Sequence, residues 1–60
     1  METSKLVKGN VYQYTDKLRR KSFTIKFINQ SKMGFSFKNV NAPVRFFFSE
    51  SDVINKITEI

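Results

Sequence analysis

Three short runs of the chain place an apolar residue, usually phenylalanine, at every second position. In the first run, Phe23, Ile25 and Phe27 alternate with polar residues from Ser22 onwards, and Ile28 then breaks the alternation. A period of two is typical of a strand that buries one face and exposes the other. The second and third runs have the same pattern, with Met33, Phe35 and Phe37, and with Val44, Phe46 and Phe48. The sequence therefore predicts three strands whose apolar sets face a shared core.

Polar clusters at 29–32 and 39–43 separate these strands and predict the loops between them. Pro43 stands at the start of the third strand, a place where proline is tolerated. Strands joined by such short loops favour an antiparallel meander.

Upstream, Leu6–Thr15 predicts a further strand with a bulge or tight bend at Gly9. Tyr12 and Tyr14 would point the same way from it, either as a stacking pair at the surface or as half-buried structural residues. The amphipathic character of tyrosine favours the structural interpretation. Residues 16–21 are polar and basic, and they predict an exposed loop between this strand and the meander.

Near the C-terminus, Ser49 is followed three residues later by Asp52, a weak form of the pattern that starts a helix. We therefore expect a short helical turn there, with Glu50 and Asp52 stabilising its start rather than forming a metal or acid-base pair. Residues 54–60 fit two states. Their apolar residues recur at helical spacing, but β-branched residues also favour a closing strand.

The chain has only 60 residues, with no cysteine and no histidine, so neither a disulfide nor a typical metal site is available to hold it together. Seven phenylalanines and two tyrosines must supply the core of a single domain spanning 1–60. We expect a mostly all-β fold, and closure into a barrel would remove the edge strands that a sheet so rich in phenylalanine could not safely expose. This fold is a small SH3-like barrel or a strongly bent antiparallel sheet of four to five strands, with one short helical turn near the C-terminus.

The order of these parts resembles the SH3-like small β-barrel proteins of phages and bacteria. The resemblance covers most of the chain and includes the glycine in the first strand, the meander, and the Phe-Ser-Glu-Ser-Asp turn within Phe48–Val53. Barrels of this kind have unrelated functions, including nucleic-acid binding and protein docking. The resemblance therefore implies a fold without specifying a partner.

The residues disfavour catalysis. No histidine base, no cysteine nucleophile and no glycine-rich phosphate loop is present, so we expect neither an enzyme nor a cofactor. No stretch resembles a signal peptide or a membrane span, and the lack of cysteine fits a reducing compartment. We expect a cytoplasmic protein without membrane insertion.

The densest cationic cluster is Lys17, Arg19, Arg20 and Lys21, in a chain with a net charge of +6 at pH 7. Such a loop either binds phosphates or simply keeps a hairpin tip soluble. Four cations within five residues repel one another and gain from an anionic partner, so we favour binding.

The outward face of the predicted sheet carries cations and one aromatic ring. Its members are Thr24, Lys26, Ser36, Lys38, Arg45 and Phe47. On a single-stranded nucleic acid, such cations would follow the backbone while the ring stacks on a base. On an acidic protein, Arg45 and Phe47 would be natural hot-spot residues. Burial of Phe47 beneath the N-terminal strand or the C-terminal helix is an equal alternative.

The sequence thus favours a small, basic, non-enzymatic binding protein whose partner is DNA or RNA. The candidate binding residues are Lys17, Arg19, Arg20, Lys21, Lys26, Lys38, Arg45 and Phe47. The alternative is a protein-interaction module, such as a phage-type modulator or inhibitor that docks on an acidic surface of a host or partner protein. Attachment to an anionic membrane ranks third, because no basic amphipathic helix is evident. The small core also permits a homo-oligomer.

Overall fold

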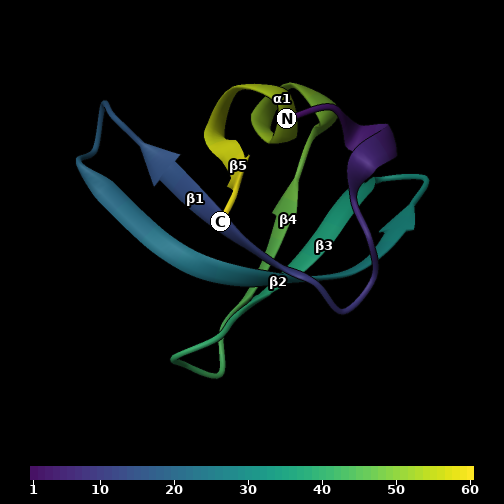
Figure 1. Cartoon of the computed structure of the whole chain (residues 1–60), viewed down its shortest axis with the longest axis horizontal. Coiled ribbons are helices and arrows are strands. Elements are labelled where there is room, and N and C mark those ends of the chain that lie inside the picture. Colours follow the sequence, from purple (N-terminus) through teal and green to yellow (C-terminus); the bar gives the residue numbers. More distant parts are fainter.

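A computed structural model describes all residues from 1 to 60 as one five-stranded antiparallel sheet with a short helix (Figure 1). The sheet has the order β4-β3-β2-β1-β5. The predicted mostly-β fold with one short C-terminal helix is confirmed. The elements are the 3-10 turn η1 (Thr3–Lys5), β1 (Val11–Asp16), β2 (Lys21–Ser31), β3 (Gly34–Asn39), β4 (Arg45–Phe48), α1 (Glu50–Lys56) and β5 (Ile57–Glu59).

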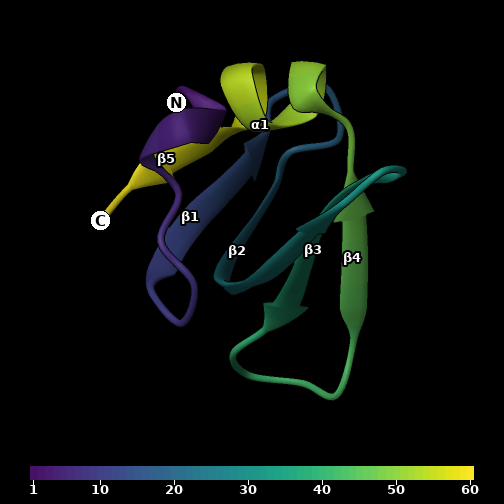
Figure 2. The same ribbon diagram turned by 90° about the vertical axis from the view of Figure 1, so that its right-hand side faces the viewer.

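The long strand β2 gives the sheet its bend. Its first half pairs with β1, and its second half pairs with β3. The register shifts between Phe27 and Asn29, where Ile28 had broken the alternation, and such a bulge bends a strand. β4 and β5 form the two edges and do not pair with each other, so the sheet is strongly bent but is not a closed barrel (Figures 1 and 2).

The core lies on the inner, concave face of the sheet, with α1 placed over its open side (Figures 1 and 2). Most of the predicted inward residues are buried there, and α1 and β5 add one apolar side chain each. The buried apolar residues are Tyr12, Ile25, Phe27, Phe35, Phe37, Phe48, Val53 and Ile57. Burial of large aromatic rings is what allows so short a chain to form a core.

Two residues predicted to face the core are exposed instead. β2 continues to Ser31, so Lys32 and Met33 form the turn of a hairpin and Met33 is 90% exposed at its tip. Val44 precedes β4 and is also exposed, since it belongs to the loop that lies at the end of the molecule away from α1 (Figures 1 and 2).

The N-terminal strand is shorter than predicted, but its bend at glycine is present. β1 begins at Val11, and Gly9 adopts a φ of +86° in the turn before it. Tyr12 is buried and its hydroxyl accepts a hydrogen bond of 2.8 Å from the backbone N–H of Val7. Together with the half-buried Tyr14, it has the structural position that the sequence favoured.

The C-terminal segment adopts both of the states that the sequence left open. Ser49 caps α1, because its hydroxyl accepts a hydrogen bond of 3.2 Å from the backbone N–H of Asp52. The helix ends at Lys56, and Ile57–Glu59 then pairs with β1 as the edge strand β5.

The amino group of Met1 fastens the start of the chain to the end of the helix. It donates hydrogen bonds to the carbonyl oxygens of Ile54 at 2.9 Å and Ile57 at 3.1 Å. A positive charge is favourable there, because the last carbonyls of a helix carry partial negative charge.

Candidate nucleic-acid interface

Three of the predicted binding residues form a line across the outer, convex face of the sheet. Lys26 on β2 lies opposite Lys38 on β3, and Lys38 lies opposite Arg45 on β4. Neighbouring strands are about 4.8 Å apart, so these side chains start close together. All three are exposed, and none takes part in an ion pair. We call Lys26, Lys38 and Arg45 the outer basic row.

Phe47 lies on the same face as this row. It is two residues beyond Arg45 on β4 and is 65% exposed, so the alternative that buried it is wrong. Ser36 on β3 lies directly opposite Phe47 and is buried, because β2 and β4 flank it on either side. The exposed ring is therefore held beside the cations by a paired strand rather than by a loop.

A groove of about 510 Å³ runs along the row. Besides the three cations, its lining includes the apolar side chains of Val11, Ile28 and Val40. No acidic side chain lines the groove. The outer face thus offers positive charge, an apolar floor and one free aromatic ring.

The acidic residues lie elsewhere in the fold. Glu50 and Asp52 are in the first turn of α1, and Glu59 is in β5. Asp52 forms an ion pair of 3.5 Å with Lys56 of the same helix. The outer basic row therefore has no neutralising carboxylate beside it.

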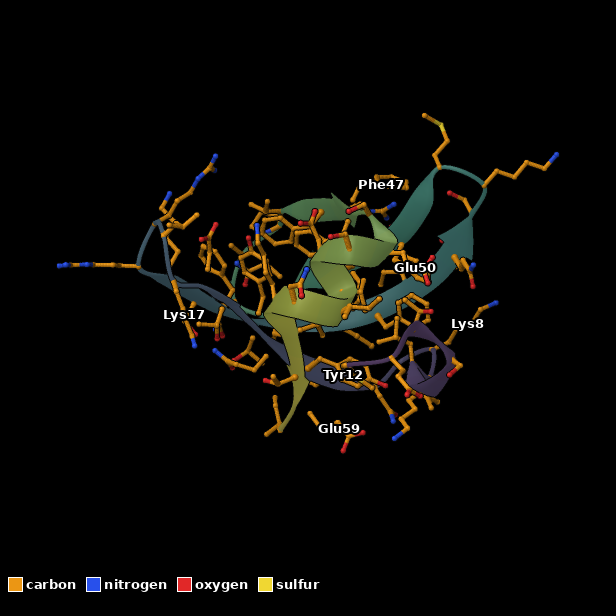
Figure 3. The ribbon with its side chains drawn as sticks, turned by 90° about the horizontal axis from the view of Figure 1, so that it is seen from above. Lys8, Tyr12, Lys17, Phe47, Glu50 and Glu59 are labelled. Atoms are coloured by element: carbon orange, nitrogen blue, oxygen red, sulfur yellow. The ribbon has the colours of Figure 1, made fainter.

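The other predicted binding residues lie at a distance from the row. Lys17–Arg20 forms the turn between β1 and β2, and Lys17 and Phe47 are well separated in Figure 3. Lys21 begins β2 and shares the inner face with Phe23, whereas Lys26 points outward. Five residues of strand place Lys21 and Lys26 about 16 Å apart. The structure thus divides the eight candidate residues into two groups of four.

Asp16 was predicted to lie in the exposed loop, but it is the last residue of β1 and is only 6% exposed. Its Oδ1 accepts hydrogen bonds from the backbone N–H groups of Leu18 at 3.1 Å and Arg19 at 3.2 Å, which shape the turn. Burial acts to raise the pKa of Asp16, but these hydrogen bonds and the charges of Lys56 and Arg19 outweigh it. The pKa of Asp16 therefore lies below its usual value.

Tyr14 accompanies Asp16 on the inner face. Its hydroxyl donates a long hydrogen bond of 3.4 Å to Asp16 Oδ2. Burial, together with the negative charge of Asp16, raises the pKa of Tyr14 despite the opposing charge of Lys56. The phenol stays protonated and remains a hydrogen-bond donor at neutral pH.

The chemistry of this surface has to be interpreted from its own residues. No family model, curated protein or solved structure matches the chain. None of its helices is both long enough and apolar enough to cross a lipid bilayer.

Sequence reasoning missed the apolar side of the groove. The alternation that sends Tyr12 inward also sends Val11 outward, so that contributor was detectable in the sequence. Val40 comes from the β3–β4 loop, and no periodic pattern places a loop residue beside a strand.

Proposed function

We propose that the chain binds single-stranded nucleic acid through the outer basic row and Phe47. The observation that carries this proposal is the row itself, in which three exposed and unpaired cations lie opposite one another on adjacent strands. Like charges directly opposite each other destabilise a sheet. An anionic ligand would remove this repulsion.

The groove and the ring suit the two halves of a nucleotide. Phosphates of a flexible strand would lie along the cations, which offer a forked guanidinium in Arg45 and point charges in the two lysines. A base would stack on the exposed face of Phe47, as aromatic rings do in proteins that bind single strands. The resemblance to SH3-like barrels, whose functions include nucleic-acid binding, is compatible with this role.

The test is a fluorescence anisotropy titration of labelled single- and double-stranded oligonucleotides. In the key variant, Lys26, Lys38 and Arg45 are all replaced by alanine. At about 1 kcal/mol per lost phosphate contact, affinity for the single strand should fall roughly 100-fold. The matched control replaces Lys5, Lys8 and Lys32, which loses the same charge outside the row. If the control binds as weakly as the row variant, binding follows net charge and the row is not the site.

Salt dependence gives a second reading from the same titration. Each phosphate neutralised on a single strand contributes about −0.7 to the slope of log K against log salt. Three contacts therefore predict roughly a 20-fold loss of affinity between 50 and 200 mM salt. The row variant should show a much flatter dependence.

Phe47→Ala tests the stacking contact without changing the charge. Loss of one base stack, worth about 1–3 kcal/mol, should weaken binding roughly 5- to 150-fold and leave the salt slope unchanged. Phe47→Tyr is the control, because it keeps a ring that can stack. Equal loss in both variants would contradict a stacking role.

A second candidate is an acidic protein surface. The observation that favours it is the apolar lining of the groove by Val11, Ile28 and Val40, which a protein side chain would fill and a phosphate chain would leave unused. This alternative predicts no oligonucleotide binding at low salt, together with saturable binding to one protein that Phe47→Ala weakens more than added salt does.

A further inference from the structure

A second hollow lies on the inner face, between the β1–β2 hairpin and the edge strand β4. Its volume is about 260 Å³, and four aromatic rings and three charged side chains line it. We call it the aromatic cleft. Its lining residues are Tyr14, Asp16, Arg19, Lys21, Phe23, Phe46 and Phe48.

The four rings of the cleft are close together, and of the four neighbouring pairs three are nearly parallel, whereas Phe23 and Phe46 are tilted by 31°. The ring centroids of Tyr14 and Phe48 are 4.9 Å apart with an interplanar angle of 11°, and those of Phe46 and Phe48 are 5.6 Å apart at 10°. Phe23 completes the set at 5.9 Å from Tyr14 and 5.8 Å from Phe46. Tyr14, Phe23 and Phe46 are only half-buried, so part of this apolar surface remains open. A flat ring is the shape that such a set accepts by stacking.

One oxygen atom of Asp16 has only long contacts. Whereas Oδ1 accepts two backbone N–H groups, the nearest donors to Oδ2 are the hydroxyl of Tyr14 at 3.4 Å and the Nζ of Lys56 at 3.8 Å. The Nε of Arg19 is 4.0 Å away. A buried carboxylate oxygen with only long contacts is ready to accept a hydrogen bond from a ligand.

The remaining lining residues make the cleft positive. Arg19 is largely exposed and has only its long contact with Asp16, and Lys21 has no ion pair. The single negative charge of Asp16 is shared with Lys56, so it does not neutralise both Arg19 and Lys21. The cleft therefore suits a ligand that combines a flat ring, an N–H donor on the ring and a negative group.

We propose that the aromatic cleft binds a nucleotide whose base carries an exocyclic amino group, with that group on Asp16 Oδ2 and the phosphate on Arg19 and Lys21. Bases stack on phenylalanine and tyrosine, and carboxylates accept from the amino group of cytosine. Cytosine, adenine and guanine have such an amino group, whereas uracil and thymine carry, at the position of cytosine's amino group, a carbonyl that a carboxylate repels. This site is on the opposite face of the sheet from the outer basic row and does not depend on it.

The test is an NMR titration of the 15N-labelled full chain with cytidine 5′-monophosphate and uridine 5′-monophosphate, which differ at this group and at the neighbouring N3, a bare acceptor in cytosine and an N–H in uracil. Cytidine monophosphate should shift the amide signals of the cleft residues and bind at least 10-fold more tightly than uridine monophosphate. Cytidine and inorganic phosphate, each alone, should bind more weakly than the whole nucleotide. Equal binding of the two nucleotides, or shifts confined to the outer basic row, would overturn the proposal.

Two variants examine the two ends of the ligand. Arg19→Ala combined with Lys21→Ala should weaken cytidine monophosphate at least 10-fold while affecting cytidine little. Asp16→Asn keeps an oxygen for the turn and places an N–H donor in the cleft, so it should favour uridine monophosphate instead. The spectrum without ligand shows that each variant is folded, and unchanged preference in folded Asp16→Asn would contradict the assigned contact.

The nucleotide has two sources, a free mononucleotide or a unit within a strand. The variant with the outer basic row replaced by alanine distinguishes them and separates this proposal from the previous one. If that variant binds the mononucleotide but no oligonucleotide, the cleft accepts free nucleotides. If it retains an oligonucleotide with shifts in the cleft alone, the cleft accepts a base of a strand. Loss of mononucleotide binding in this variant would overturn the independence of the two sites.

Discussion

Arg20 is the only residue other than glycine with a positive φ, at +53°. It closes the turn that follows Asp16, and a left-handed conformation costs a residue with a side chain about 1–2 kcal/mol. Glycine avoids this cost, but it makes the unfolded chain more flexible, which offsets part of the gain in stability. We expect Arg20→Gly to stabilise the protein by about 0.5–1 kcal/mol in urea unfolding. Arg19→Gly removes the same charge at an ordinary φ and should destabilise, so a gain in both variants would contradict the explanation.

Asp16 makes stability depend on pH in the acid range. Its pKa is lower in the folded chain than the usual 3.8, so its carboxylate contributes stability that is present above that value. This stability is lost as the pH falls through the folded pKa. In urea unfolding between pH 7 and pH 2, the wild type should therefore weaken more steeply below about pH 4 than Asp16→Asn. Parallel profiles would show that another carboxylate is responsible.

Among the strands, the hairpin of β2 and β3 depends on a close approach to the end of β4. A Cβ atom on Gly34 would lie 2.6 Å from the carbonyl oxygen of Phe48, and Gly34 also has a φ of +143°. Gly34→Ala should therefore destabilise by about 2–4 kcal/mol, because overpacking and backbone strain add. Gly9→Ala is the matched control. It has positive φ and open space, so it should cost about 1–2 kcal/mol. Equal losses would mean that the contact with Phe48 is easily relieved.

Some features of the strands and the helix could be predicted from the sequence, and others could not. Alternation identified the faces of β2 and β3, and the serine cap marked the start of α1, because each signal is local. Met33 was predicted to face the core because it continues the alternation of Phe35 and Phe37, but it lies in the turn of the hairpin, and only the pairing of Ser31 with Gly34 reveals where that turn falls.

For the molecule as a whole, the sequence predicted a strongly bent sheet but not which side chains the bend would bring together. The bend of β2 brings the ring centroid of Phe23 to 5.8 Å from that of Phe46 on β4, and this approach forms the aromatic cleft. The same fold places Lys21 and Lys26 on opposite faces, about 16 Å apart, so the predicted basic loop and the predicted sheet face belong to different surfaces. Among the candidate residues, the row and Phe47 followed from alternation alone.

The outer basic row predicts a conflict between binding and stability. Lys38 faces a cation on both sides, and each like-charge pair costs about 0.2–1 kcal/mol. Lys38→Thr should therefore raise the free energy of unfolding at low salt while weakening nucleic-acid binding. The gain should shrink in 1 M salt, where charges are screened. Lys32→Thr at the exposed hairpin tip is the control, and an equal gain there would assign the effect to net charge.

The edge strand β4 is held to its two neighbours by different kinds of contact. Hydrogen bonds connect β4 to β3, whereas only aromatic rings connect β4 to the β1–β2 hairpin. Apolar contacts weaken as water is cooled. Cooling should therefore weaken the contacts among the aromatic rings first. β4 would then move away from the β1–β2 hairpin, while the hydrogen bonds between β4 and β3 keep their register.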